Sequence, residues 1–302
     1  MKLKELLYGL LWGTLGVLSG QVHAESTYNI QTAVALAKSD YFDYNRTDSS
    51  KLIEATYYFK PVVMDDSQPF TELSFLQRTS HVGISYTNTD REMSQWSTTT
   101  LKPLMFSGNW YVGDFFLSAS HNALPETLIT KTTLNQSWNY ARTQTSIHLG
   151  YFVLPSTSLS LTHSQSVTSQ SSVAGSDPFN DKTTTSNGLN VHSVRNLNTQ
   201  DAISADIFIS RISNTDGATS GGNTAYGFNV KYFPAMNWYL QGGYATNDGD
   251  STNGRGNTLA WGAGYQFNPQ LGLLFGTSQF MVSDDSAGSD RSTAQLTLTY
   301  RF

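Results

Sequence analysis

The last ten residues of the chain, 293–302, alternate strictly between polar and apolar side chains. A period of two is typical of a β-strand whose two faces meet different surroundings. One face carries Ala294, Leu296 and Leu298 and ends on Tyr300 and Phe302, and the opposite face carries hydroxyl, amide and guanidinium groups. A strand of this kind suits a wall that separates an apolar medium from water.

Similar alternation recurs along the chain and predicts an all-β, up-and-down antiparallel barrel of about 14 strands, with 12 or 16 as alternatives. Outward faces are expected, for example, at Ile207, Tyr226, Phe228 and Trp261. Short turns flanked by aromatic residues are expected at one end of the barrel. Seven longer polar stretches predict loops at the other end, near residues 41–50, 88–95, 122–136, 169–184, 213–222, 247–257 and 284–290.

The N-terminal segment has the features of a secretory signal peptide. Lys2 and Lys4 precede an apolar run over 6–18, and Val22-His23-Ala24 offers small residues for cleavage. We therefore expect a signal peptide over 1–24 and a barrel over 25–302. The apolar run is shorter than the roughly 20 residues that a membrane-spanning helix needs. Because no other segment is more apolar, a mature chain embedded in a membrane would have to be a closed barrel.

The composition agrees with a barrel wall and argues against several other classes of protein. Aromatic residues make up 13% of the chain and charged residues only 14%, well below the roughly 25% of ordinary soluble domains. The mean hydropathy is nevertheless −0.32, so uncharged Ser, Thr, Asn and Gln supply the polarity. Cysteine is absent, which excludes disulfides and thiolate metal sites. The net charge of −5 is the wrong sign for nucleic-acid binding.

The closing strand that ends on Phe302 resembles the closing strand of Gram-negative outer-membrane porins. The spacing of Glu72, Phe75-Leu76, Arg78, Ser80, Val82 and Tyr86 also resembles the second-hairpin region of bacterial porin sequences. The resemblance implies export to the bacterial outer membrane, with Tyr300 and Phe302 as the signal for the barrel-assembly machinery. It further implies contact with membrane lipid and lipopolysaccharide, as a monomer or a homotrimer. It supplies no selectivity residues that can be transferred.

The resulting functional hypothesis is a porin, an aqueous pore for passive diffusion of small hydrophilic solutes that needs no cofactor. Selectivity in such a pore comes from charged groups on the lumen wall. Cations outnumber acids among the predicted lumen residues, but acidic loops act in the opposite direction, so the sign of the selectivity stays open. The predicted pore-lining residues are Glu54, Lys60, Arg142, His148, Arg195, Asp206, Lys231, Gln241 and Arg301.

The stretch 61–79 interrupts the alternation. Pro61 and Pro69 forbid a regular central strand there. Phe70, Leu73 and Leu76 could share one helical face, which predicts a segment folded against the mouth of the barrel, with Glu72 or Arg78 at a constriction. The alternative is a plain long turn followed by a third strand that begins near Phe70.

Two other functions compete with the porin hypothesis. A closed structural or adhesive barrel would have a lumen plugged by 61–79 or by large side chains. A barrel hydrolase would need catalytic groups on one rim, but neighbours such as His163 and Ser164 point to opposite faces of a strand. The pairs Asp65-Asp66 and Asp284-Asp285 are better explained as solvated turns. We therefore predict no catalytic residues, no metal site and no enzymatic activity.

Overall fold

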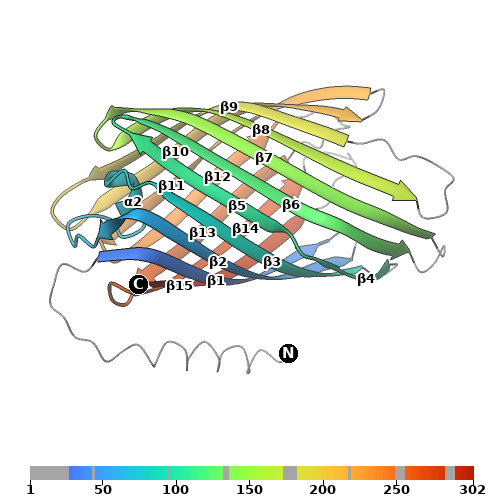
Figure 1. Cartoon of the computed structure of the whole chain (residues 1–302), viewed down its shortest axis with the longest axis horizontal. Coiled ribbons are helices and arrows are strands. Elements are labelled where there is room, and N and C mark those ends of the chain that lie inside the picture. The colour runs from blue at the N-terminus through green and yellow to red at the C-terminus, as the bar shows by residue number, and fades with distance from the viewer. Residues whose placement is uncertain are drawn as a thin grey trace.

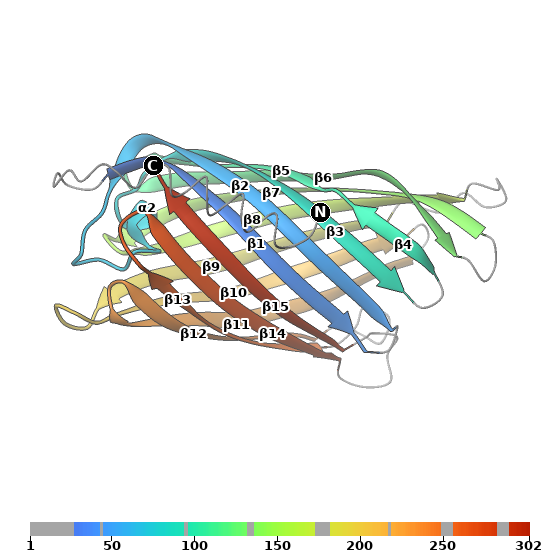
Figure 2. The same ribbon diagram turned by 90° about the horizontal axis from the view of Figure 1, so that it is seen from below.

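The computed structural model describes residues 27–42, 45–93, 96–131, 136–172, 182–216, 219–248, 256–282 and 290–302. This part of the chain forms a closed, strongly tilted antiparallel barrel (Figures 1 and 2). Its strands are β1 (Thr27–Tyr41), β2 (Arg46–Val63), β3 (His81–Met93), β4 (Trp96–Leu101), β5 (Leu104–Val112), β6 (Phe115–Lys131), β7 (Gln136–Leu154), β8 (Thr157–Ser172), β9 (Lys182–Asn196), β10 (Ala202–Asp216), β11 (Thr219–Ala235), β12 (Trp238–Asn247), β13 (Gly256–Gln266), β14 (Leu271–Val282) and β15 (Arg291–Arg301).

The barrel wall contains 14 strand positions, which we call staves, as the sequence predicts. β4 and β5 both pair with β3 and are separated by Lys102 and Pro103, so they form one interrupted stave. Pro103 cannot donate a backbone hydrogen bond, which explains the break. Consecutive strands pair in order, and β1 closes the wall by pairing with β15, for example Val34 with Leu298.

The two faces of the wall follow the predicted alternation. Ile207, Tyr226, Phe228 and Trp261 are 47–57% exposed on the outside of the barrel. The pairing register assigns the face of the other wall residues, because a residue lies on the same face as the residue directly opposite on the next strand. The described residues contain no helix of the length and apolarity needed to cross a membrane.

Several predicted loops are shorter than expected. Residues 122–131 continue β6, residues 88–93 continue β3, and residues 46–50 begin β2. Backbone pairing extends beyond the apolar belt because each added residue still finds a partner across the ladder, whatever its side chain. The turn chemistry of Ser, Thr and Asn therefore misled the prediction. The loop 284–290 lies outside the described residues except for Asp290, as does the whole signal-peptide prediction over 1–24.

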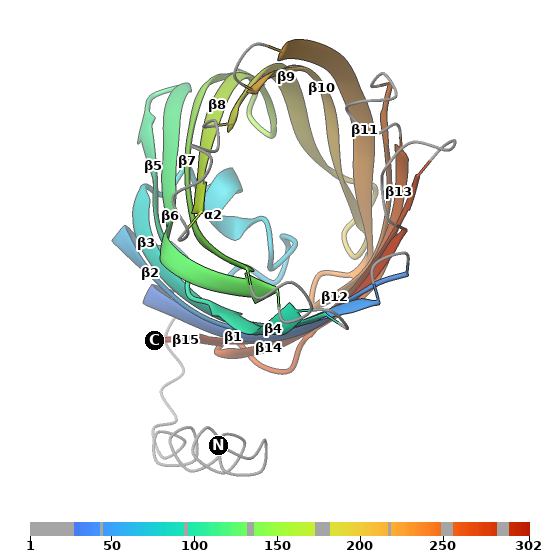
Figure 3. The same ribbon diagram turned by 90° about the vertical axis from the view of Figure 1, so that its right-hand side faces the viewer.

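Residues 64–80 leave the wall after β2 and fold into the lumen, at the end of the barrel where the C-terminus lies. They include the single described helix, α2 (Leu73–Leu76). A view along the barrel shows α2 and its flanking segments inside the ring of strands (Figure 3). We call residues 64–80 the plug. The predicted inward fold is confirmed, and the alternative of a strand beginning near Phe70 is wrong, since β3 begins at His81.

Candidate functional site: the plug and its seat

The plug is built from local turns that its sequence specifies. Asp65 accepts hydrogen bonds from the backbone N–H and the hydroxyl of Ser67, which turns the chain after β2. The chain turns away from α2 at Arg78, two residues after the helix ends, where a φ of 51° lies in the left-handed region. The N–H groups of Arg78 and Thr79 donate to the carbonyls of Phe75 and Ser74, which is the Schellman pattern of a helix end.

Gln77 fastens the end of the helix to the end of β2. Its side-chain amide donates to the Val63 carbonyl at 2.6 Å and accepts from the Val63 N–H at 2.8 Å. Both backbone groups of Val63 are thereby satisfied at a position where β2 no longer pairs with β3. The plug consequently turns back into the lumen.

Two apolar contacts hold the plug against two different parts of the wall. Phe70 packs against Phe233 and Tyr239, with ring centroids 6.5 and 5.8 Å away. Leu73 is 1% exposed and packs in a second cluster with Tyr28, Tyr58 and Val62. These two side chains are the main apolar anchors of the segment.

Between them, Glu72 makes the central polar contact of the plug. Its Oε1 lies 2.8 Å from Nζ of Lys231 on β11, and its Oε2 lies 3.2 Å from Nε2 of His192 on β9. Nδ1 of His192 in turn lies 2.7 Å from Oδ1 of Asp206 on β10. One carboxylate of the plug therefore binds a chain of charged groups that spans three neighbouring strands.

The pKa of Glu72 reflects this arrangement. Burial by itself would raise the pKa of the carboxyl, because it disfavours the charged form. The hydrogen bond from His192 and the charge of Lys231 outweigh burial and lower the pKa to about 2, from an ordinary 4.5. Glu72 is therefore a carboxylate at neutral pH, and the pairs around it are charge-assisted.

Arg78 joins the plug to the wall on the β5–β7 side. Its Nη1 lies 2.5 Å from Oδ1 of Asp114 in the turn between β5 and β6, and its guanidinium stacks 4.3 Å from the ring centre of Phe152. Phe75 of α2 lies 4.9 Å from Phe152 and 4.3 Å from His192, measured between ring centres.

On the opposite wall, Arg301 is 5% exposed beneath the plug. Its Nε and Nη1 donate to the side-chain carbonyls of Gln31 and Gln266, at 3.0 and 2.7 Å. Its guanidinium lies 5.1 Å from the ring centre of Tyr28 and 5.9 Å from that of Phe70. The plug therefore contacts strands on several sides of the lumen, including β2, β7, β11 and β15.

We call the wall residues that contact the plug its seat. The structure brings five of the sequence-predicted site residues to the plug and its seat, namely Glu72, Arg78, Asp206, Lys231 and Arg301. Glu54, His148 and Gln241 also lie on the lumen face, farther along the wall, and Arg142 lies on this face toward the loop end. Lys60 is exposed beyond the last β2–β3 pair. Their roles in permeation stay predictions.

Arg195 lies elsewhere than expected. It is three residues after His192, so alternation places it on the outward face together with Leu189, which is 39% exposed. Sequence reasoning also missed His192 and Asp114. The outward Leu189 and Val191 mark the phase of β9 and could have placed His192 in the lumen.

Tyr300 lies on the outward face of β15 and Phe302 follows it, with their rings 4.6 Å apart. The backbone of Phe302 hydrogen-bonds to Ile30 in both directions, which closes the seam between the first and last strands. This position accords with an assembly signal at the C-terminus, although that role stays a prediction.

The residues considered for hydrolysis do not form a catalytic group in the described structure. His163 faces outward and bonds Asn187 on β9, whereas Ser164 bonds Ser146 on the lumen face. Asp65 is used in its own turn, and Asp284-Asp285 lie outside the described residues. Among the described residues no group of three acidic or imidazole side chains is placed to hold a metal ion.

Comparisons with known proteins identify the fold. No protein-family profile matches the chain, and no curated protein matches its sequence. Among solved structures, the chain is similar to the outer membrane protein Omp33 of Acinetobacter baumannii, with 18% identity, a TM-score of 0.53 and coverage of 92% of this chain and 100% of Omp33. It is also similar to the monoaromatic hydrocarbon channel CymD, with 10% identity, a TM-score of 0.55 and coverage of 92% and 89%. The chain thus shares the fold of outer-membrane β-barrel channels.

Proposed function

We propose that the protein is an outer-membrane channel for passive diffusion of small hydrophilic solutes, and that the plug is its gate. The chemistry of the lumen supports this proposal. The side chains buried on the inner face include Ser85, Ser158, Ser160, Ser166 and Asn223. A hydroxyl- and amide-lined lumen suits water and polar solutes, and serves an apolar substrate poorly.

The outer surface supports placement in a bilayer. Its exposed residues are apolar over the middle of the strands, and aromatic residues such as Tyr151, Tyr232, Tyr265 and Phe267 gather toward the plug end. In this proposal the plug end, with its short turns, is periplasmic and the opposite end is extracellular. The proposed partners are membrane lipid, lipopolysaccharide and the barrel-assembly machinery, after cleavage of the signal peptide over 1–24.

The proposal that the plug is a gate rests on the contacts that hold the plug in the lumen. Only four of its residues are helical, and it has two large apolar anchors, Phe70 and Leu73. Its ion pairs with the wall join Glu72 to Lys231 and His192 and Arg78 to Asp114. Ring contacts of Phe75 and the hydrogen bonds of Gln77 with Val63 add to them. Such pairs exchange readily with water and ions when they separate, so the plug can leave its seat without unfolding the wall.

The plug also favours a second candidate, a closed structural or adhesive barrel, because it lies inside the lumen at one end of the barrel. The two candidates differ in one measurable property. A gated channel conducts when the plug is released, whereas a structural barrel has no path for ions after release.

The experiment is planar-bilayer conductance of the wild-type protein and of a variant in which a flexible linker replaces residues 65–79. Tyr58 is the last residue of β2 that pairs with β3, opposite His81, and β2 continues for five more residues to Val63. The linker must therefore span the length of these five residues to reach the start of β3, roughly 17 Å at ~3.4 Å per residue. About eight Gly/Ser residues cover this span. We expect the linker variant to conduct in larger or longer steps than the wild type.

Heat-modifiable migration and recovery in the outer-membrane fraction confirm that both proteins are folded and located as proposed. Folded barrels that carry no current in either form would overturn the channel in favour of the structural barrel. Recovery of the wild type as a soluble periplasmic protein would overturn the location as well.

A further inference from the structure

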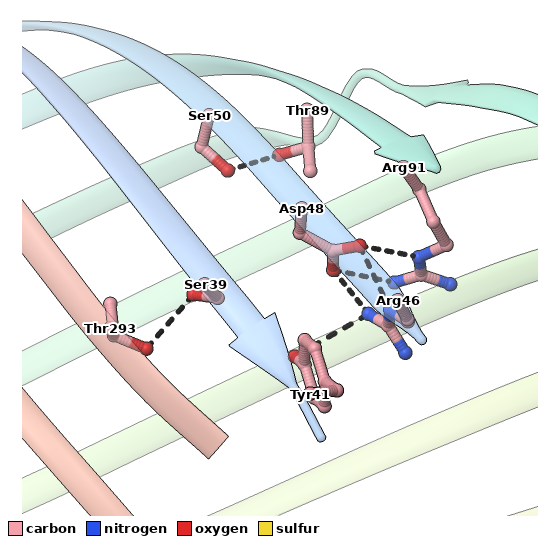
Figure 4. Close-up of polar contacts among 8 residues, drawn as sticks. All are labelled: Ser39, Tyr41, Arg46, Asp48, Ser50, Thr89, Arg91 and Thr293. Atoms are coloured by element: carbon pink, nitrogen blue, oxygen red, sulfur yellow. Dashed lines mark hydrogen bonds and ion pairs between the residues drawn. The ribbon is translucent and has the colours of Figure 1, made fainter. Parts of the chain in front are cut away.

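Far from the plug, at the loop end of the lumen, three of four neighbouring strands carry an arginine on the lumen face. Tyr41 on β1 lies directly opposite Arg46 on β2 and Arg291 on β15, and Asp48 lies opposite Arg91 on β3. Figure 4 shows the two guanidinium groups of Arg46 and Arg91 converging on the carboxylate of Asp48.

A single carboxylate orients these two guanidinium groups. Arg91 donates from Nε and Nη2 to the two oxygens of Asp48, at 3.2 and 3.4 Å. Arg46 donates to the same two oxygens through its own Nε and Nη2, and it stacks 4.1 Å from the ring centre of Tyr41. Asp48 is 8% exposed and fully engaged. Two cations share one acid, so this part of the lumen wall keeps a positive charge.

A pocket of about 200 Å³ opens beside this group, between Arg91 and Arg142 of β7. Arg142 donates from Nε to Ser166 at 3.0 Å and from Nη2 to Gln144 at 3.3 Å, which are both neutral partners. In both arginines, Nη1 takes part in none of these bonds. The pocket is lined also by Thr89, Leu101, Pro103, Asn122, Leu124, Tyr140 and Gln144, so its described lining contains no acid.

Asn122 supplies a further sign of a missing partner. Its side-chain oxygen is buried and accepts no hydrogen bond from the described residues. A side-chain amide can be turned by 180° with little change in shape, which would present its NH₂ group instead. A ligand with acceptor oxygens would then meet two guanidinium groups and an amide donor.

We propose that this pocket binds an oxyanion, and that the solutes of the channel are small molecules carrying a carboxylate or a phosphate. Paired guanidinium groups match the planar, bidentate geometry of such oxyanions. The volume is below the roughly 300 Å³ at which pockets for drug-sized ligands begin, so a small solute fits best. The identification of solutes rests on the proposed channel function, whereas the binding site itself does not.

The first test is the reversal potential in a KCl gradient, measured on the plug-linker variant, in which the current is expected to be largest. We expect anions to permeate better than cations. Arg142→Gln, and Arg91→Gln with Arg142→Gln, should move the ratio of chloride to potassium permeability toward or below one. Arg211→Gln is the matched control, because it removes one positive charge from the outward face of β10. A cation-selective parent, or an equal change in the control, would overturn the assignment of solutes.

The second test does not require conduction. Calorimetry on the folded wild-type protein in detergent would follow binding of inorganic phosphate and, separately, of acetate. We expect binding of at least one probe, weakened roughly tenfold or more by Arg142→Gln, since the substitution removes a charge-assisted hydrogen bond to the anion. Stronger binding of phosphate or of acetate distinguishes the two classes of solute.

The two tests separate the two proposals. Oxyanion binding by a barrel that never conducts would refute the channel and retain the site. Conduction with no binding of either probe, or with binding unaffected by Arg142→Gln and by the double substitution, would refute the site and retain the channel. Because Arg142 is exposed on the lumen wall, its replacement is expected to leave the fold intact.

Discussion

Nζ of Lys231 and Oε1 of Glu72 lie 2.8 Å apart, although 159 residues separate them in the chain. Lys231 belongs to the barrel wall and Glu72 to the plug, so this pair joins the proposed gate to the wall. A buried ion pair adds little net stability over apolar packing, but the loss of one partner leaves the other charge uncompensated. The pair therefore fixes where the plug sits more than it stabilises the barrel.

Replacing Glu72 by Gln should release the plug. The substitution removes the charge that Lys231 and His192 share, and we expect it to weaken docking of the plug by about 1.5–3 kcal/mol. The effect is not larger because Lys231 is 22% exposed and can turn toward lumen water. Single-channel recording should show a higher open fraction. Glu54→Gln, on the same lumen face but away from the plug, is the control, and an equal effect in both variants would contradict the role of Glu72.

The pH dependence of gating should follow the pKa of Glu72. Because its folded pKa of about 2 lies below the ordinary 4.5, its contribution to docking is complete above pH 4.5 and is lost as the pH falls toward 2. We expect the plug to stay seated at pH 4.5 and to open progressively below it. Conductance recorded between pH 6 and pH 2 checks this. In Glu72→Gln that acid-induced step should be absent.

Arg78 should respond unusually to substitution. Its backbone has a φ of 51°, which glycine adopts freely and alanine does not. Arg78→Ala and Arg78→Gly both remove the contacts with Asp114 and Phe152, but alanine keeps a strained backbone. We expect amide hydrogen exchange in the plug to be faster in Arg78→Ala, by an amount equivalent to about 1 kcal/mol. Equal exchange rates in the two variants would show that backbone strain at Arg78 does not affect the stability of the plug.

The two faces of β15 should tolerate charge differently. Leu298 lies on the outward face opposite Val34 and Leu273, whereas Thr297 lies on the lumen face opposite Ala35. In a bilayer, Leu298→Arg should cost roughly 2–4 kcal/mol and impair assembly. Thr297→Arg should fold normally, as judged by heat-modifiable migration. Equal assembly of the two variants would be incompatible with this register.

The sequence by itself determined the wall of this protein. Period-two alternation depends only on which residues are apolar, so it placed Leu296 and Trp261 outside and Arg301 inside, and it gave 14 staves. Strand ends were less certain, because polar residues pair in a ladder as well as they form loops. Pro69 and the apolar spacing of 61–79 predicted a segment folded against the barrel mouth with Glu72 or Arg78 toward the pore, beside the alternative of a plain turn. Pro61 was wrongly expected to end the strand, because β2 continues through it to Val63 and pairs there with β1.

Only the tertiary structure decided what that segment and the arginines contact. The partners of Glu72 lie on β9 and β11, 120 and 159 residues away, and no local pattern specifies which lumen side chains meet across a barrel. The pocket between Arg91 and Arg142 is likewise lined from β3, β6 and β7, together with Leu101 and Pro103, which flank the interruption between β4 and β5. Local periodicity fixes the face of each residue, whereas closure of the barrel and its tilt fix which faces converge at the same height.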